Sequence, residues 1–218
     1  PFASLYKLNK KYCIAASPER FLKKTGNQLI CQPIKGTAKR NTQNCVLDNQ
    51  YKTELSESQK ERSENVMIVD LVRNDLSRVC KAGSVTVKEL CGIYTFPQVF
   101  QMISTIQGEL PADIHWADAI KVCFPMGSMT GAPKKRVMEL IDQYEEIGRG
   151  LFSGSIGYIT PQSNFDFNVV IRSIFYDEEN QKLSYAAGGG ITFNSIAENE
   201  YEESLLKAAA IKQVLENQ

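Results

Sequence analysis

The sequence of 218 residues contains a single histidine, His115, and this scarcity restricts the chemistry that the chain can perform. A zinc site built on two or three histidines is excluded. A serine–histidine–aspartate triad would have to use His115, and no Gly-x-Ser-x-Gly motif accompanies it. The composition therefore points away from histidine-ligated zinc enzymes and from triad hydrolases.

The sequence also lacks an excess of either charge and any long apolar run. Its 25 Lys and Arg residues balance 25 Asp and Glu residues, so nothing predicts a nucleic-acid or membrane partner. No apolar segment approaches the roughly 20 residues that span a bilayer. Residues 1–12 form no signal peptide and lack an initiator Met, as expected inside a longer chain. Six cysteines without a Cys-x-x-Cys motif predict free thiols, and hence a cytoplasmic protein.

Apolar patterning predicts an α+β fold. Strands are expected at 12–16, 29–31, 84–90, 99–110, 153–161, 168–177 and 183–187, and helices at 53–79, 116–124, 133–144 and 198–215. The polar segment 41–50 is expected to be a loop, and Leu205, Leu206, Ala209 and Ile211 are expected to face inward. Because strands come in runs with helices inserted between them, a largely antiparallel sheet is favoured. No change of composition marks a second domain, so we expect one domain over 1–218.

Two of the expected helices each carry a pair of glutamates three residues apart. Glu61 and Glu64 share one helix face, as do Glu200 and Glu203, and Lys207 extends the second stripe. Two such pairs could surround a hard cation such as magnesium, which prefers oxygen ligands. From the spacing alone, a solvated charged face is the favoured interpretation of each pair.

Glycine-rich turns and one lysine complete the set of candidates. Residues 187–192 place three glycines between a strand and a helix, and residues 127–134, which include Thr130, open another helix. The glycines of the first segment let backbone amides approach a ligand closely. The second segment presents N–H groups suited to a carboxylate or phosphate, although it is not a P-loop. Lys35 follows a strand beside Gly36 and, taken alone, is expected to be a surface lysine.

Several segments of the chain stand in the order found in one enzyme family. They are residues 17–21 (Ser-Pro-Glu-Arg-Phe), 33–37 (Pro-Ile-Lys-Gly-Thr), 60–65 (Lys-Glu-Arg-Ser-Glu-Asn), 69–76, 124–134, 154–158, 171–172, 187–191 and 200–203. Together they resemble the chorismate-utilising enzymes, which include the large subunits of anthranilate synthase and aminodeoxychorismate synthase. The resemblance covers nearly the whole chain. It implies a chorismate-binding catalytic domain built as an α/β sandwich of mostly antiparallel sheets, here lacking its first strands and therefore amino-terminally truncated.

The resemblance also implies roles for individual residues. Glu64 and Glu203 match the magnesium ligands, and Glu61 and Glu200 match carboxylates that act through metal-bound waters. The magnesium is expected to bind the ring carboxylate of chorismate. The residues matched to the other substrate contacts are Tyr158 and Arg172 at the enolpyruvyl carboxylate, Gly188, Gly190 and Lys207 at further carboxylate positions, and Thr130 beside the ring.

The residue at position 35 separates two reactions within the family. Anthranilate synthases resemble Pro-Ile-Ala-Gly-Thr at this motif, whereas aminodeoxychorismate synthases resemble the Pro-Ile-Lys-Gly-Thr of residues 33–37. In the latter, the lysine is a nucleophile in a magnesium-dependent amino transfer from ammonia to chorismate. The product, 4-amino-4-deoxychorismate, is a precursor of 4-aminobenzoate and folate. The resemblance further implies a glutamine amidotransferase partner that supplies ammonia.

One residue departs from the family pattern, and two alternatives remain open. Gln101 stands where relatives often carry a histidine that anthranilate synthases use in the elimination of pyruvate. This difference, like Lys35, weighs against the first alternative, an anthranilate synthase component. The second alternative is a non-catalytic fragment that binds chorismate or an amidotransferase.

Overall fold

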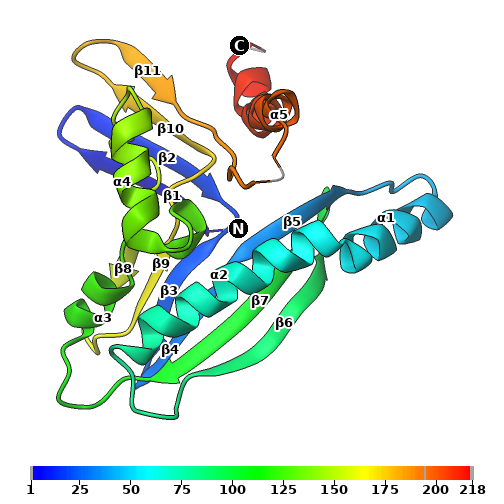
Figure 1. The fold of residues 1–218 in the computed structure, drawn as a ribbon. Coiled ribbons are helices and arrows are strands. Elements are labelled where there is room, and N and C mark those ends of the chain that lie inside the picture. The colour runs from blue at the N-terminus through cyan, green and yellow to red at the C-terminus, as the bar shows by residue number, and fades with distance from the viewer. Residues whose placement is uncertain (1, 194, 217–218) are drawn as a thin grey trace. The chain divides into compact units, whose positions relative to one another are not determined.

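The structure, a computed structural model, describes residues 2–193 and 195–216. Its contacts divide the chain into two compact units, which are described separately (Figure 1). The first unit contains residues 1–20, 145–158 and 167–218, and the second contains residues 21–144 and 159–166. Each unit therefore joins segments that are distant in the sequence, and the composition gives no sign of this division.

The elements occur in the following order along the chain. They are β1 (Phe2–Leu8), β2 (Lys11–Ser17), β3 (Arg20–Thr25), β4 (Gln28–Gln32), β5 (Ile34–Lys39), α1 (Cys45–Glu57), α2 (Gln59–Ser77), β6 (Thr86–Thr95), β7 (Val99–Glu109), α3 (Trp116–Cys123), the 3₁₀ turn η1 (Gly127–Met129), α4 (Lys134–Tyr144), β8 (Gly157–Ile159), β9 (Phe165–Asn168), β10 (Ser173–Asp177), β11 (Lys182–Tyr185) and α5 (Ala197–Glu216). Within the described ranges, no helix combines the length and the apolarity that a membrane crossing requires.

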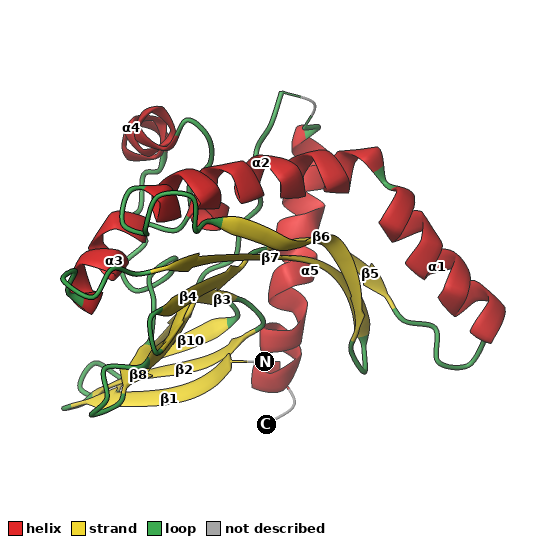
Figure 2. Cartoon of the chain, turned by 90° about the horizontal axis from the view of Figure 1, so that it is seen from below, coloured by secondary structure: helices red, strands yellow, loops and turns green. Residues whose placement is uncertain are grey.

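The sheet of the first unit has four strands, among the residues described, in the order β1-β2-β10-β11. Strand β2 pairs antiparallel with both β1 and β10 (Figure 2). Its residues alternate between buried and exposed, with Cys13, Ala15 and Ser17 buried. This alternation is the pattern of a strand that presents one face to a core.

The other sheet has, over the described part of the chain, the strand order β5-β7-β4-β3-β9-β8, and β6 also pairs with β7. Strand β7 pairs antiparallel with β4, β5 and β6, and helix α2 packs across it (Figures 1 and 2). The face of α2 that lies on the sheet buries Ile68, Val69 and Leu76. The predicted α+β class with largely antiparallel pairing is confirmed.

The expectation of a loop at 41–50, followed by one helix over 53–79, is wrong. Helix α1 begins at Cys45, because the side chain of Asn44 accepts hydrogen bonds from the backbone N–H groups of Val46 and Leu47. The helical segment is then interrupted at Ser58, whose backbone leaves the helical region and whose hydroxyl caps α2 by accepting from the Glu61 N–H.

The expected inward face of the last helix is also wrong in part. In α5, Leu205 and Leu206 are 48% and 75% exposed, and Ala209 is exposed as well. Ile211 is half-buried. The apolar spacing predicted a helix correctly, but it does not show which side of that helix has a neighbour.

The six cysteines are free thiols, and all of them except Cys45 are buried. Burial raises the pKa of Cys80 to about 11 and that of Cys123 to about 12. Burial also raises the pKa of Cys31 well above its ordinary value. These thiols therefore behave as small apolar side chains of the core rather than as nucleophiles.

Candidate active site

Lys35 lies at an irregularity in strand β5 of the second unit. The register of β5 against β7 shifts between Ile34 and Thr37, so that Lys35 and Gly36 form a bulge. Gly36 has a positive φ of 93°, and a methyl group placed on it would lie 3.1 Å from Glu61 Oε2 and 3.2 Å from Glu61 Cβ. Only glycine accommodates both the backbone angle and the approach of α2. Half-buried Lys35 therefore lies in a bulge whose other residue, Gly36, leaves little room for a side chain beside Glu61.

The first turns of α2 carry the other candidates of this unit. Glu61 lies in the first turn, where the helix dipole and the Ser58 cap favour a carboxylate. Glu61 and Glu64 are both half-buried, which differs from the solvated face favoured by the spacing alone. The structure thus brings Glu61 to the Lys35 bulge and places Glu64 less than one helical turn further along.

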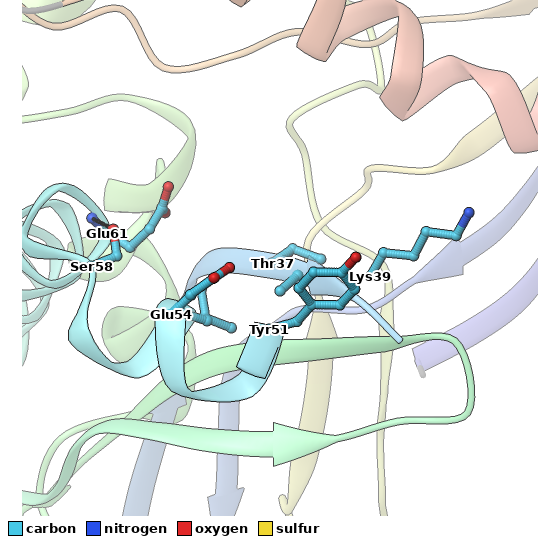
Figure 3. Close-up of a pocket in the computed structure, with 8 residues that line it drawn as sticks. Thr37, Lys39, Tyr51, Glu54, Ser58 and Glu61 are labelled. Carbon is cyan, nitrogen blue, oxygen red and sulfur yellow. Dashed lines mark hydrogen bonds between the residues drawn. The ribbon is translucent and has the colours of Figure 1, made fainter. Parts of the chain in front are cut away.

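A groove of about 340 Å³ opens between β5 and the junction of α1 with α2 (Figure 3). It is lined by Thr37, Ala38, Lys39, Tyr51, Glu54, Leu55, Ser58 and Glu61. Figure 3 shows the amine of Lys39 extending away from the carboxylates of Glu54 and Glu61. The groove thus reaches Glu61 and has two carboxylates, those of Glu54 and Glu61, in its lining.

The turn that contains Thr130 docks on α2 in the same unit. Gly127 lies so close to α2 that an added methyl group would be 2.7 Å from Leu71 Cδ2. Half-buried Thr130 donates its hydroxyl to the Met126 carbonyl at 3.1 Å, which fixes the side-chain rotamer. The turn is therefore held by backbone packing, and Thr130 Oγ1 keeps its lone pairs for a further donor.

A buried ion pair ties the end of this turn to α2. Lys134 Nζ lies 2.6 Å from Asp75 Oδ2, and the two side chains are 17% and 7% exposed. Burial raises the pKa of Asp75, and the hydrogen bond from Lys134 opposes that shift without cancelling it. The Asp75 carboxylate therefore depends on its partner to remain charged.

Replacing Lys134 with methionine is expected to lower the free energy of unfolding by about 3 kcal/mol at neutral pH, because it strands the Asp75 carboxylate. The loss should shrink as the pH is lowered, since the raised pKa of Asp75 means that the folded state takes up this proton before the unfolded chain does. Urea unfolding at several pH values measures both effects. The double variant Asp75→Asn, Lys134→Met should recover most of the stability, and an equal loss in it would reject the explanation.

In the first unit, α5 and the glycine segment hold the remaining carboxylates. Lys207 Nζ lies 2.6 Å from Glu203 Oε1 and donates to the Gly188 carbonyl at 3.1 Å. Buried Glu200 accepts a hydrogen bond from Ser195 Oγ at 2.8 Å. A methyl group on Gly189 would lie 3.0 Å from Glu200 Oε2. On this stripe of α5, Glu200 and Lys207 contact the glycine segment or the loop that follows it, and Glu203 pairs with Lys207.

Arg172 joins this group through the backbone of α5. It has a positive φ of 53° just before β10, and its guanidinium donates to the Lys207 carbonyl. Burial lowers the pKa of Arg172, and the charge of Glu203 opposes that shift. Among the described residues, no hydrogen bond joins Tyr158 or Gly190 to the group; both are exposed, Tyr158 at 64%.

The described residues contain no group of three or more His, Cys, Asp or Glu side chains that could hold a metal ion. Helices α2 and α5 nevertheless each carry two of the candidate carboxylates, and carboxylate oxygens are ligands that magnesium prefers.

Gln101 is buried on β7 opposite Thr37 of β5, close to the Lys35 bulge along the strand. The individual roles of these residues remain predictions.

The sequence interpretation missed a buried polar cluster beneath α2. Asn65, which follows Glu64, is fully buried and contacts Ser104 of β7 and Cys91 of β6. A signal was available, because Asn65 interrupts the apolar face that Ile68 and Leu76 continue.

Comparison with known proteins gives a consistent result along the whole chain. The profile of the family described as chorismate binding enzyme matches residues 1–213. The chloroplastic aminodeoxychorismate synthase of Arabidopsis thaliana is 44% identical over 96% of this chain and 22% of that protein. Aminodeoxychorismate synthase component 1 of Escherichia coli is 41% identical over 99% of this chain and 47% of that protein.

A solved structure shows the same fold. Anthranilate synthase component I from Streptococcus pneumoniae has a TM-score of 0.84 and 33% identity, covering 95% of this chain and 45% of that chain. The chain thus spans half or less of the length of these relatives. Motifs, fold and profile agree, and the chain belongs to the family of chorismate binding enzymes.

Proposed function

We propose that the protein acts as an aminodeoxychorismate synthase, which converts chorismate and ammonia to 4-amino-4-deoxychorismate. The observation that carries this proposal is Lys35 in the β5 bulge, next to Gly36, where an added methyl group would lie against Glu61. It is supported by the names of the relatives, which are aminodeoxychorismate synthases at 41% and 44% identity. A lysine here supplies a nucleophile that an alanine could not.

In this reaction the neutral amine of Lys35 forms a bond to ring carbon 2 of chorismate while the 4-hydroxyl departs. Ammonia then forms a bond at carbon 4, and the bond between Lys35 and carbon 2 breaks. The proton released when Lys35 adds combines with the departing hydroxide to give water. The proton released when ammonia adds is taken up by the departing amine of Lys35. The bulge holds the backbone of half-buried Lys35 in position, so less conformational entropy is lost when its amine is placed at the ring.

The four glutamates are proposed to hold magnesium, with Glu64 and Glu203 as direct ligands and Glu61 and Glu200 acting through water. When bound, magnesium supplies charge stabilisation for the ring carboxylate and for the departing hydroxyl. The carboxylate oxygens fit this ion by their chemistry. If Glu203 bound the metal in place of Lys207 Nζ, its present partner, Lys207 would be available to a substrate carboxylate.

The other residues of the first unit are proposed to bind the anionic substrate. Arg172 offers a planar fork to the enolpyruvyl carboxylate, assisted by Tyr158. Gly188, Gly190 and Lys207 offer N–H donors to a second carboxylate. Thr130, which belongs to the second unit, is proposed to lie beside the ring. The partial desolvation of Arg172 strengthens its attraction for an anion.

The full-length protein is proposed to work in the cytoplasm with a glutamine amidotransferase that supplies ammonia, on the route to 4-aminobenzoate and folate. The test of function does not need that partner. Full-length protein is incubated with chorismate, magnesium and an ammonium salt, and the product is identified by mass and absorbance. 4-Amino-4-deoxychorismate supports the proposal, whereas anthranilate would identify an anthranilate synthase and no turnover would leave a chorismate-binding protein.

Replacing Arg172 with lysine is expected to weaken chorismate binding tenfold to about a hundredfold, because a point charge cannot replace two parallel hydrogen bonds. Calorimetric titration of chorismate in the presence of magnesium measures the affinity. Arg136→Lys is the control, since Arg136 forms an exposed ion pair with Glu139 on α4. Equal affinity in Arg172→Lys and the wild type would show that Arg172 does not bind chorismate and serves only to hold α5 through the Lys207 carbonyl.

A further inference from the structure

A buried polar cluster joins α2 to two strands of the sheet beneath it. Asn65 and Ser104 have no exposed surface. Ser104 Oγ donates to Asn65 Oδ1, and Asn65 Nδ2 donates to the Met102 carbonyl at 3.5 Å. Cys91 Sγ lies 3.7 Å from Asn65 Oδ1. The amide of Asn65 thus connects one point of α2 with both β6 and β7.

The backbone of β6 is distorted at the same place. Cys91 adopts a positive φ of 55°, and the register of β6 against β7 shifts between Glu89 and Gly92. In this conformation the Cys91 N–H donates to Ser104 Oγ at 2.9 Å. A non-glycine residue in the left-handed region costs conformational energy, so the surrounding contacts must hold it there. Where β6 departs from regular pairing with β7, the Cys91 N–H thus becomes a hydrogen-bond donor to the Ser104 hydroxyl.

The remaining contacts between α2 and the sheet are largely apolar. Burial of the apolar side chains stabilises the packing of α2 even if the helix shifts slightly, because the hydrophobic effect has no direction. These side chains are Ile68, Val69 and Leu76. A hydrogen-bonded amide in a dry core is different, since sliding or rotating the helix would leave it unsatisfied. Asn65 is therefore the residue of this face that fixes the rotation and the register of α2.

That rotation decides where the two candidate ligands point. Glu61 precedes Asn65 by four residues and shares its face, while Glu64 is its immediate neighbour, about 100° away around the axis. The space between Glu61 and Gly36 is small, because Glu61 Oε2 would lie 3.1 Å from a methyl group added to Gly36. A small rotation of α2 would displace both carboxylates and the wall beside Lys35.

We propose that Asn65, held by Ser104, is a positioning residue that sets α2 so that Glu61 and Glu64 meet the metal and Lys35 meets the substrate. The role in metal binding rests on the proposed function, whereas the role in setting α2 does not. The positive φ of Cys91 and the register shift of β6 then have a structural explanation, since both place the Cys91 N–H where it donates to the hydroxyl that holds Asn65.

Asn65→Leu and Ser104→Ala, made in the full-length protein, test this. Asn65→Leu keeps the volume and removes the hydrogen bonds, and Ser104→Ala removes the partner. Both are expected to weaken magnesium binding in the presence of chorismate by about 10- to 100-fold, as measured by calorimetry. Ser104→Thr, which keeps the hydroxyl, should restore affinity to near the wild-type value. Ile68→Val, on the same helix face, should lower the melting temperature without changing the affinity for magnesium.

A crystal structure of Asn65→Leu supplies the second readout. We expect α2 to be rotated or shifted on β7, with Glu61 carried away from Gly36. An unchanged α2, or an unchanged affinity for magnesium together with a lower melting temperature, would overturn the proposal. If the wild type itself fails to bind magnesium, the proposed function fails, and the position of α2 in the variant still decides whether Asn65 sets the helix.

Discussion

Replacing Lys35 with alanine in the full-length protein is expected to reduce ammonia-dependent formation of aminodeoxychorismate by at least about a thousandfold. Binding of chorismate with magnesium should persist, because Lys35 is not among the proposed metal or carboxylate ligands. Removing a nucleophile eliminates the covalent step, whereas removing an electrostatic neighbour only weakens a contact. The steady-state rate and the calorimetric affinity, measured on the same preparation, separate the two effects.

The covalent step has a direct chemical signature. Quenching the wild-type reaction without ammonia should leave Lys35 heavier by chorismate less one water, because the amine adds as the hydroxyl departs. Peptide mass spectrometry locates the adduct, and Lys52→Ala, which removes an exposed lysine of α1, should form it normally. Full turnover by Lys35→Ala together with an unmodified wild-type peptide would show that Lys35 is not the nucleophile.

Replacing Glu64 or Glu203 with glutamine is expected to remove the magnesium dependence of chorismate binding. Each substitution keeps the shape of the side chain and removes the charge that a hard cation requires. The two residues lie on different helices, α2 and α5, so equal losses in the two variants would indicate that both helices contribute to one ion. The loss at Glu203 has a second component, because Lys207 loses its partner at 2.6 Å.

The measurement is a calorimetric titration of chorismate at several magnesium concentrations. Glu202→Gln is the matched control, since Glu202 is exposed on α5 and lies off the stripe of Glu200, Glu203 and Lys207. It should bind chorismate with the normal dependence on magnesium. An unchanged dependence in Glu64→Gln or Glu203→Gln would remove that residue from the proposed ligand set.

Elements whose patterning is local could be predicted from the sequence. The short apolar run at 12–16 predicted β2, and the local sequence pattern predicted α3 and α4 to within about a residue. The break between α1 and α2 was missed because Ser58 resembles any other polar residue of a helix. Its capping role depends on a single backbone angle, which periodicity does not report.

The candidate site was predictable as residue types and much less so as geometry. The two glutamate pairs could be placed on helices, since the spacing of three residues is enough for that. The bulge at Lys35 could not be predicted, because it arises from pairing with β7, more than 60 residues further along the chain. The cluster at Asn65 has the same origin, since Ser104 and Cys91 come together only through the sheet.

The distribution of thiols has a practical consequence for experiments on this protein. Cys45, at the first residue of α1, is exposed, whereas the other five cysteines are buried. A maleimide dye added to the native chain of these 218 residues is therefore expected to attach at the first residue of α1. Unfolding would uncover five more reactive sulfurs, so the number of labels per molecule distinguishes folded from unfolded chains of these 218 residues.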